Sequence, residues 1–96
     1  MSTKKIVFAN WKMNLDRESI AIFLEELLNL KFNSDKVDIV IAPPLVYLCD
    51  TLNKVLSSKI SVASQNTFYE HNGPYTGEVS VDMLKDIGCT WVMIGH

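Results

Sequence analysis

The 96-residue sequence lacks concentrated charge of either sign, and its formal net charge is only −2. Nucleic acids and membrane surfaces both select clustered Lys and Arg, whereas these residues are spread along the chain, so we expect neither partner. Long apolar runs are missing as well. No stretch approaches the roughly 20 residues that cross a bilayer, and the apolar residues 6–9 are too few for a signal peptide. A hydrophobic content of 48% indicates a globular protein.

Cysteine is scarce, and its spacing fits no metal or redox motif. Cys49 and Cys89 are far apart, without a CxxC pair and without Cys or His at ligand spacing. We therefore predict no metal site and interpret both cysteines as reduced, buried thiols of a cytoplasmic protein. A disulfide or a reactive thiol is the alternative. The sequence also lacks GxGxxG and P-loop motifs, which argues against nucleotide-binding folds.

What the sequence does contain is an alternation of two kinds of segment. Runs rich in β-branched and aromatic residues predict strands at residues 5–9, 37–42, 60–63 and 90–94. Apolar residues at helical spacing predict helices over residues 16–30, 44–56 and 80–88. This order predicts an α/β fold with a parallel sheet. Because parallel strands are normally covered on both faces and the last predicted element is a strand, we expect residues 1–96 to be the front part of a larger α/β fold.

Two of the predicted helices carry recognisable ends and inward faces. In the second, Pro44 suits the first helical position, and the predicted apolar face consists of Leu45, Leu48, Leu52, Val55 and Leu56. In the third, Ser80 is the expected N-cap and Gly88 the C-cap. Its predicted apolar face consists of Met83, Leu84 and Ile87.

Polar residues follow the predicted strands, where reactive groups of α/β folds gather. These residues are Asn10 and Lys12 (with Trp11 between them), Gln65 and Asn66, and His96. A lysine suits a phosphate or a developing oxyanion, and a histidine can donate a proton. No carboxylate follows a strand end apart from Glu70 and Glu78 within the long loop, so this rim offers electrophilic and anion-binding groups without a general base. Plainer interpretations are a solvated lysine, turn-forming asparagines, and tryptophans that pack in the core.

The stretch of residues 65–80, QNTFYEHNGPYTGEVS, is a long loop between the third predicted strand and the third predicted helix. Loops of this length are uncommon in compact domains unless they are functional or disordered. Three aromatic residues beside tight-turn glycines favour a packed, protruding loop that offers a partner surface. Disorder is the alternative.

Four motifs together resemble the triosephosphate isomerase family: FANWKMN, APPLVYL, VASQNTFYEHNGPYTGEVS and MLKDIGCTWVMIGH. The resemblance implies a (β/α)8 barrel, of which residues 1–96 are three βα units plus the fourth strand, one domain truncated after that strand. It implies interconversion of dihydroxyacetone phosphate and D-glyceraldehyde 3-phosphate through an enediolate, in glycolysis and gluconeogenesis, without metal or cofactor. A non-catalytic half-barrel fragment and another phosphate-binding α/β-barrel protein remain alternatives.

The same resemblance implies roles for individual residues. Asn10 and Lys12 bind the small phosphorylated triose, with Trp11 as a weaker substrate-binding candidate. His96 polarises the substrate carbonyl and shuttles protons, together with a glutamate base that follows much later in the family. The fragment alone is therefore expected to be inactive.

The resemblance also implies a homodimer formed through the 65–80 loop. The loop surrounds the neighbouring subunit's residue at the position of Met13, and Thr76 reaches the region of the partner's Asn10 and the partner's Lys12. Glu78 pairs with an arginine beyond residue 96, while Gln65 and Asn66 hold the base of the loop.

Overall fold

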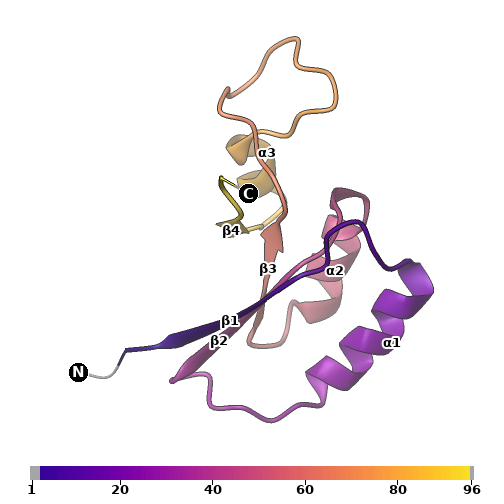
Figure 1. Cartoon of the computed structure of the whole chain (residues 1–96), viewed down its shortest axis with the longest axis vertical. Helices are drawn as coiled ribbons and strands as arrows, with labels where there is room; N and C mark the ends of the chain where they lie inside the picture. The colour runs from indigo at the N-terminus through magenta and orange to yellow at the C-terminus, as the bar shows by residue number, and fades with distance from the viewer. Residues whose placement is uncertain (1–2, 96) are drawn as a thin grey trace.

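The computed structural model describes residues 3–95 and contains one four-stranded sheet (Figure 1). The strands are β1 (Lys5–Asn10), β2 (Val37–Ala42), β3 (Ile60–Ser64) and β4 (Trp91–Val92). All neighbouring pairs are parallel, and the strands lie in the order of the sequence. The predicted α/β fold is confirmed, and the four strands curl as half of a barrel wall. The fourth strand is shorter than predicted, because only Trp91 and Val92 pair with β3.

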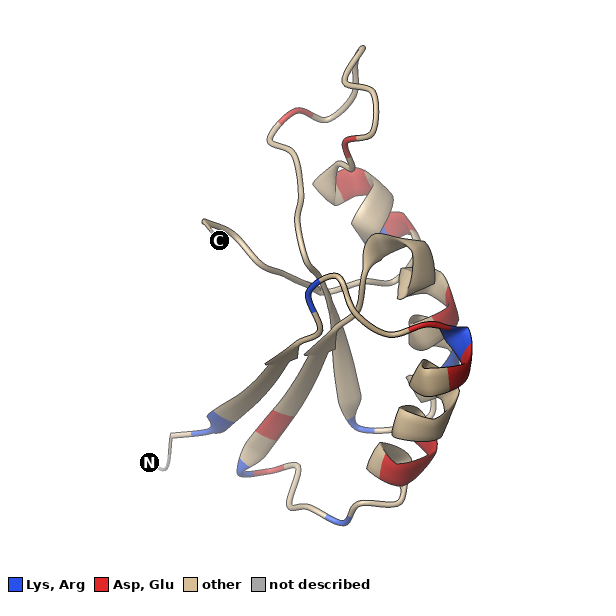
Figure 2. Ribbon diagram, turned by 45° about the vertical axis from the view of Figure 1, so that its right-hand side comes forward, with Lys and Arg blue, Asp and Glu red and all other residues tan. Residues whose placement is uncertain are grey.

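Helices cover one face of this sheet (Figure 2). They are α1 (Arg17–Leu28), the single 3₁₀ turn η1 (Leu45–Tyr47), α2 (Leu48–Val55) and α3 (Val81–Asp86). No helix within residues 3–95 is both long and apolar enough to cross a membrane.

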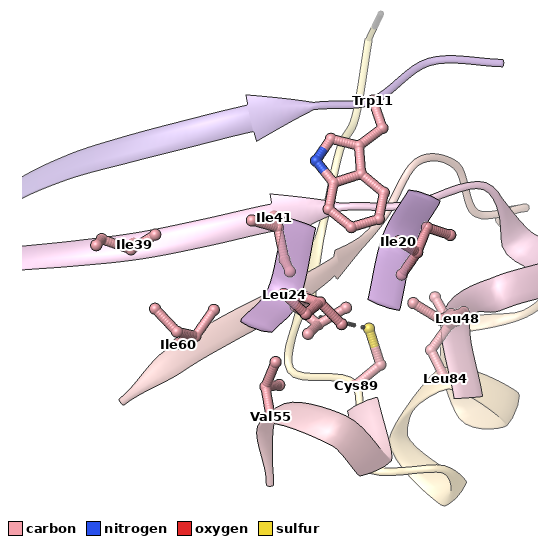
Figure 3. Packing of buried hydrophobic residues seen from close by; sticks show 11 residues of the cluster. Trp11, Ile20, Leu24, Ile39, Ile41, Leu48, Val55, Ile60, Leu84 and Cys89 are labelled. Atoms are coloured by element: carbon pink, nitrogen blue, oxygen red, sulfur yellow. Dashed lines mark hydrogen bonds between the residues drawn. The ribbon is translucent and has the colours of Figure 1, made fainter. Parts of the chain in front are cut away.

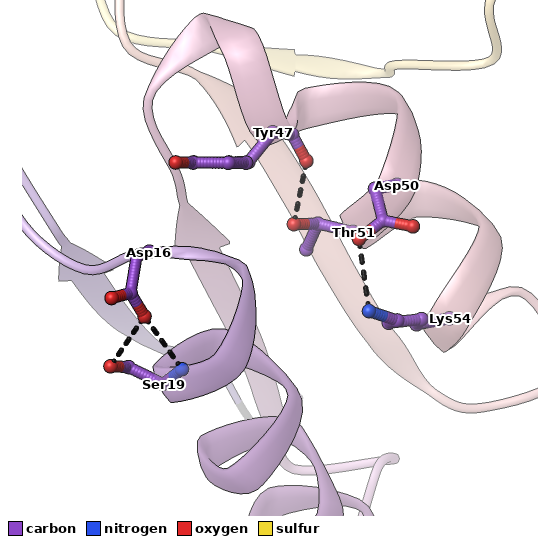
Figure 4. Close-up of polar contacts among 6 residues, drawn as sticks. All are labelled: Asp16, Ser19, Tyr47, Asp50, Thr51 and Lys54. Carbon is purple, nitrogen blue, oxygen red and sulfur yellow. Dashed lines mark hydrogen bonds and ion pairs between the residues drawn. The ribbon is translucent and has the colours of Figure 1, made fainter.

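Side-chain caps fix where two helices begin. Asp16 accepts hydrogen bonds from the Ser19 amide at 2.8 Å and from Ser19 Oγ at 2.7 Å (Figure 4). The bonds from Ser19 lower the pKa of Asp16 from its ordinary value of 3.8, because they favour the ionised carboxylate. Ser80 Oγ accepts from the Met83 amide at 3.1 Å, which confirms the predicted N-cap of α3. Gly88 follows α3 with φ of +86°, a conformation that glycine adopts without strain.

The predicted helix at residues 44–56 differs from the observed one at both ends. It opens as the 3₁₀ turn η1, whose tighter winding shifts the phase of the following residues, and α2 ends at Val55. Leu45 and Leu56 therefore point away from the core, with exposed fractions of 51% and 79%, and their predicted burial is wrong. Within α2, Thr51 Oγ1 donates to the Tyr47 carbonyl and Lys54 pairs with Asp50 (Figure 4).

Two further burial predictions fail for geometric reasons. Cys49 is exposed, because it follows the inward-facing Leu48 by one position, about 100° around the helix. On α3, Met83 and Ile87 are exposed and only Leu84 is buried, since the short helix offers the sheet a narrow face. The prediction for Cys89 is confirmed: it is buried, with Sγ 3.5 Å from the Val62 carbonyl oxygen, and both cysteines are free thiols.

The core lies between the sheet and the helices (Figure 3). Ile20 and Leu24 of α1, Ile41 of β2 and Leu48 of α2 are each at most 2% exposed. Fully burying such a side chain stabilises the fold by roughly 1.5–3 kcal/mol. A second, smaller cluster of Val40, Ala42 and Ala63 occupies the opposite face, against Trp91 and Met93. By contrast β1 is an edge strand and is exposed along residues 5–8.

Candidate functional site

The carboxyl ends of β1 and β2 lie side by side. Their register pairs Asn10 with Ala42, so the residues that follow each strand start from the same edge. Asn10 is half-buried, whereas Lys12 is exposed. Lys12 Nζ makes no ion pair with any residue in the range 3–95, so its charge is available to a ligand. Asn10 and Lys12 thus lie at the carboxyl edge of the sheet, as the sequence predicts, and their binding role stays a prediction.

Hydrogen bonds hold the Lys12 backbone from both sides. The Asn10 side-chain oxygen accepts from the Lys12 amide at 2.9 Å, and Gln65 Nε2 donates to the Lys12 carbonyl oxygen at 2.9 Å. Lys12 has φ of +55°, which costs a non-glycine residue about 1–3 kcal/mol. Each hydrogen bond contributes about 1 kcal/mol, so the two together offset a strain of this size. The position of the Lys12 backbone is therefore imposed by its neighbours rather than by its own preference.

Gln65 links three strand ends. Its Nε2 also donates to the Ala42 carbonyl oxygen at 2.8 Å, so one side chain from the end of β3 bonds the ends of β1 and β2. The Ala42 oxygen accepts a second bond, from the Trp11 amide at 3.1 Å. The sequence predicts Gln65 as one of the polar residues after the strands and as a support of the 65–80 loop, but not as a donor to the ends of β1 and β2. Its position directly after the strand next to β2 was the one signal in the sequence for this wider role.

Trp11 lies in the core. Its side chain is 8% exposed, and the indole makes an edge-to-face contact with Phe23, with ring centroids 5.4 Å apart. The interpretation of Trp11 as a packing residue is confirmed, and we propose no substrate contact for it. The buried ring anchors the segment that carries Lys12, and Asn14 Nδ2 donates to the Trp11 carbonyl oxygen at 3.0 Å.

His96, the predicted electrophile, lies outside the residues that the structure describes, so its role stays a prediction. The strand that leads to it is well defined. Val92 pairs with Ser64, and the Met93 amide donates to the Ser64 carbonyl oxygen at 2.9 Å. β4 therefore ends beside β3, on the same rim as Gln65.

The 65–80 loop protrudes from the sheet (Figure 1). Contacts among its own residues hold it together. At its base, Ser64 Oγ donates to the Asn66 carbonyl oxygen, and both Thr67 Oγ1 and the Phe68 amide donate to the Val79 carbonyl oxygen. At its tip, the Phe68 and Tyr75 rings lie 4.6 Å apart. The loop is thus a defined segment, as predicted from its aromatic residues and glycines.

The predicted interface residues other than Gln65 face solvent in the single chain. Thr76, Glu78 and Asn66 are exposed, and Met13 is 93% exposed. Methionine side chains are usually buried, so an almost fully exposed one is unusual. No side chain in the described range, residues 3–95, covers Met13, and dimerisation stays a prediction.

The fold and the rim define the class of the protein. Four parallel strands in the order of the sequence, curled as half of a barrel wall with helices on one face, are the architecture of the N-terminal part of a (β/α)8 barrel. Residues 5–96 match the model of the triosephosphate isomerase family. The chain belongs to this family.

Individual relatives agree with the assignment. The chain is 41% identical over 95 residues to triosephosphate isomerase, chloroplastic, of Arabidopsis thaliana, covering 99% of the chain and 30% of the relative. It is 40% identical over 96 residues to triosephosphate isomerase of Streptococcus equi subsp. zooepidemicus, covering 100% and 38%. For the enzyme of Zygosaccharomyces bailii the identity is 41%, again covering 100% and 38%. The chain spans about a third of the length of these relatives.

Proposed function

We propose that residues 1–96 form the N-terminal part of a single (β/α)8-barrel domain of a triosephosphate isomerase. The reaction is the interconversion of dihydroxyacetone phosphate and D-glyceraldehyde 3-phosphate, with no metal or cofactor. The observation that carries the proposal is the imposed backbone of Lys12: it has φ of +55°, its amide donates to the Asn10 side chain, and its carbonyl oxygen accepts from Gln65 Nε2. Strain held in place by neighbouring groups is typical of residues whose position serves function.

The chemistry assigned to the rim is electrostatic. The Lys12 ammonium would neutralise the substrate phosphate and the negative charge that develops on the reacting oxygens. The Asn10 amide would orient the same oxygens, and His96 would polarise the carbonyl by donating a hydrogen bond. Within residues 3–95, no carboxylate directly follows a strand end, and the loop after β3 carries Glu70 and Glu78 further along. The general base would therefore be a glutamate supplied by another part of the protein.

The proposal is tested with the full-length protein that carries this chain. We expect Lys12→Ala and His96→Ala each to lower kcat/KM by at least about a hundredfold, since each removes a group that acts on transition-state charge. Lys85→Ala, an exposed lysine on α3, is the matched control for loss of a positive charge and should retain parental activity. Near-parental turnover by either rim variant would remove that residue from the catalytic site.

The 96-residue polypeptide alone is proposed to be a non-catalytic fragment, because its rim lacks a general base. A coupled assay should detect no isomerase activity above buffer, because the base is missing from the strand ends. Turnover at enzymic rates would contradict the assignment of the base to another part of the protein.

We further propose that the protein is a homodimer through the 65–80 loop. The exposure of Met13 and the preformed loop support this role, because a protruding aromatic loop and an exposed thioether are complementary apolar surfaces. Sedimentation of the full-length protein tests it: replacing the loop tip, residues 69–76, by a short Gly-Ser link should yield a monomer. A tight dimer after that replacement would contradict the proposal. Three of the relatives are named as chloroplastic, so the family does not decide the location, and we propose a cytoplasmic one.

A further inference from the structure

The turn that follows β1, residues 11–15, is strained at two places. Lys12 has φ of +55° and Leu15 has φ of +75°, and every other residue with positive φ within residues 3–95 is a glycine. Non-glycine residues keep such a conformation only where the surrounding structure over-determines it, and they cluster at functional sites. The contacts that hold this turn therefore bear on the position of Lys12.

The strand ends satisfy three of the four backbone polar groups of Trp11 and Lys12. The Trp11 amide donates to the Ala42 carbonyl oxygen at 3.1 Å, at the end of β2. The Lys12 amide donates to Asn10 Oδ1 at 2.9 Å, and the Lys12 carbonyl oxygen accepts from Gln65 Nε2 at 2.9 Å. These contacts leave the Trp11 carbonyl oxygen to be satisfied by the turn itself.

Asn14 supplies the fourth partner. Its Nδ2 donates to the Trp11 carbonyl oxygen at 3.0 Å, in a partly buried position. Trp11 is 8% exposed, and its ring lies in the core against Phe23, so the acceptor belongs to an anchored residue (Figure 3). The bond ties the outer end of the turn back to the core across Lys12 and Met13. Lys12 thus lies inside a short segment that is closed by a side-chain amide.

We infer that Asn14 is a positioning residue for Lys12. The inference rests on the proposed function, in which the Lys12 ammonium acts on the substrate, and it gives Asn14 itself no contact with the substrate. Without the Asn14 amide the Trp11 carbonyl oxygen loses its partner and the strained turn can relax. The Lys12 ammonium is then held in its working position for a smaller fraction of the time. A hydrogen bond of ordinary strength changes such a population by about two- to tenfold.

Steady-state kinetics of the full-length protein that carries this chain test the inference. Asn14→Ala should lower kcat/KM by about two- to tenfold. In the Lys12→Ala background the same change should have no further effect, because residues that act through one another are not additive. A merely structural role of Asn14 would lower the activity by the same factor in both backgrounds, and that result would overturn the inference. An unchanged kcat/KM in Asn14→Ala would overturn it as well.

Asn33→Ala is the matched control. Asn33 is also an exposed asparagine that makes a local hydrogen bond, since its Oδ1 accepts from the Asp35 amide at 3.0 Å. It lies in the loop that enters β2, at the opposite end of the sheet from Lys12. The control should keep parental kcat/KM. A loss equal to that of Asn14→Ala would mean that any local amide bond has this effect, and it would count against a specific role of Asn14.

Hydrogen exchange separates this inference from the proposed function. The Lys12 amide, which donates to Asn10 Oδ1, should lose protection by about two- to tenfold in Asn14→Ala and should keep it in Asn33→Ala. Unchanged protection in Asn14→Ala would overturn the positioning role. Near-parental turnover by Lys12→Ala would instead overturn the role proposed for Lys12, while the protection of the Lys12 amide would still decide whether Asn14 holds the turn.

Discussion

The segment of residues 11–16 after β1 and the loop of residues 65–80 after β3 both start at the carboxyl end of a strand, yet different contacts hold them. The first is short and depends on Gln65, which is 53 positions away from Lys12 in the sequence. The second is long and holds itself, through hydrogen bonds to Val79 and a cluster of its own rings. The candidate catalytic lysine is thus positioned by a residue that is distant in the sequence. The candidate docking surface is held by contacts between residues of the same loop. Disturbing the loop beyond Gln65 should leave the segment that carries Lys12 largely intact.

The largest effect is expected from Gln65→Ala. The change leaves the carbonyl oxygens of Lys12 and Ala42 without the Nε2 donor and releases the strained backbone at Lys12. Displacing a charged group by about 1 Å can cost up to a hundredfold in rate, so kcat should fall about 10- to 100-fold. Because Gln65 would act only through Lys12, steady-state kinetics should show a smaller loss than Lys12→Ala. Asn53→Ala, an exposed amide on α2, is the control and should keep parental kinetics.

Gly73→Ala should disturb the local loop instead. Gly73 has φ of +138°, and an added Cβ would lie 2.6 Å from Tyr75 Cε2. Strained backbone of this kind costs of order 1–3 kcal/mol, and the displaced ring adds to it. Gly77→Ala is the matched control, because Gly77 also has positive φ (+85°) but its Cβ would meet nothing within 4 Å. Urea denaturation of the full-length protein should show the greater loss for Gly73→Ala; equal losses would mean that the Tyr75 contact contributes nothing.

A smaller effect is expected at Leu15, from a comparison of two variants. This residue has φ of +75° and is 42% exposed, so a leucine here combines backbone strain with partial burial. Leu15→Gly and Leu15→Ala both lose the buried part of the side chain, but glycine also removes about 1–2 kcal/mol of strain and adds about 0.5–1 kcal/mol of unfolded-state entropy. Leu15→Gly should therefore have a free energy of unfolding roughly 0.5 kcal/mol above that of Leu15→Ala in urea denaturation. A less stable Leu15→Gly would contradict the strain.

The smallest expected effect is the acid dependence contributed by Asp16. Its folded-state pKa is lowered by the hydrogen bonds from Ser19, so its stabilising contribution is present above the ordinary value of 3.8 and is lost as pH falls through the lowered folded value. Asp16→Asn can still accept from the Ser19 amide but cannot titrate. Denaturation curves between pH 2 and 6 should therefore be slightly flatter for the variant, and an identical acid dependence would exclude the contribution of this cap.

Much of the fold was predictable because its signals are local. Strand composition, helical spacing and the Ser80 cap each involve residues within a few positions of one another, and all three predictions are confirmed. The failures arise where local patterns shift phase. Leu45 and Leu56 repeat at helical spacing, but the 3₁₀ turn before α2 and the end of α2 at Val55 turn them outward.

In the candidate site, too, the features that depend on local sequence were predictable and those that depend on distant contacts were not. Asn10 and Lys12 were found because strand ends can be located in a sequence. The bonds of Gln65 to Lys12 and Ala42 were not, since they join residues 53 and 23 positions apart and leave no periodic trace. The positive φ of Lys12 follows from those bonds, so it was equally hidden.

The oxygen of Ala42 receives hydrogen bonds from both Gln65 Nε2 and the Trp11 amide, and every amino acid would supply that oxygen. Position 42 is also fully buried, so its side chain is limited only by the room available. A substitution survey would therefore record a size preference at this position and overlook the acceptor. Atom-level replacement, such as an α-hydroxy acid in place of Pro43 that weakens the preceding carbonyl, is the kind of change that reaches it.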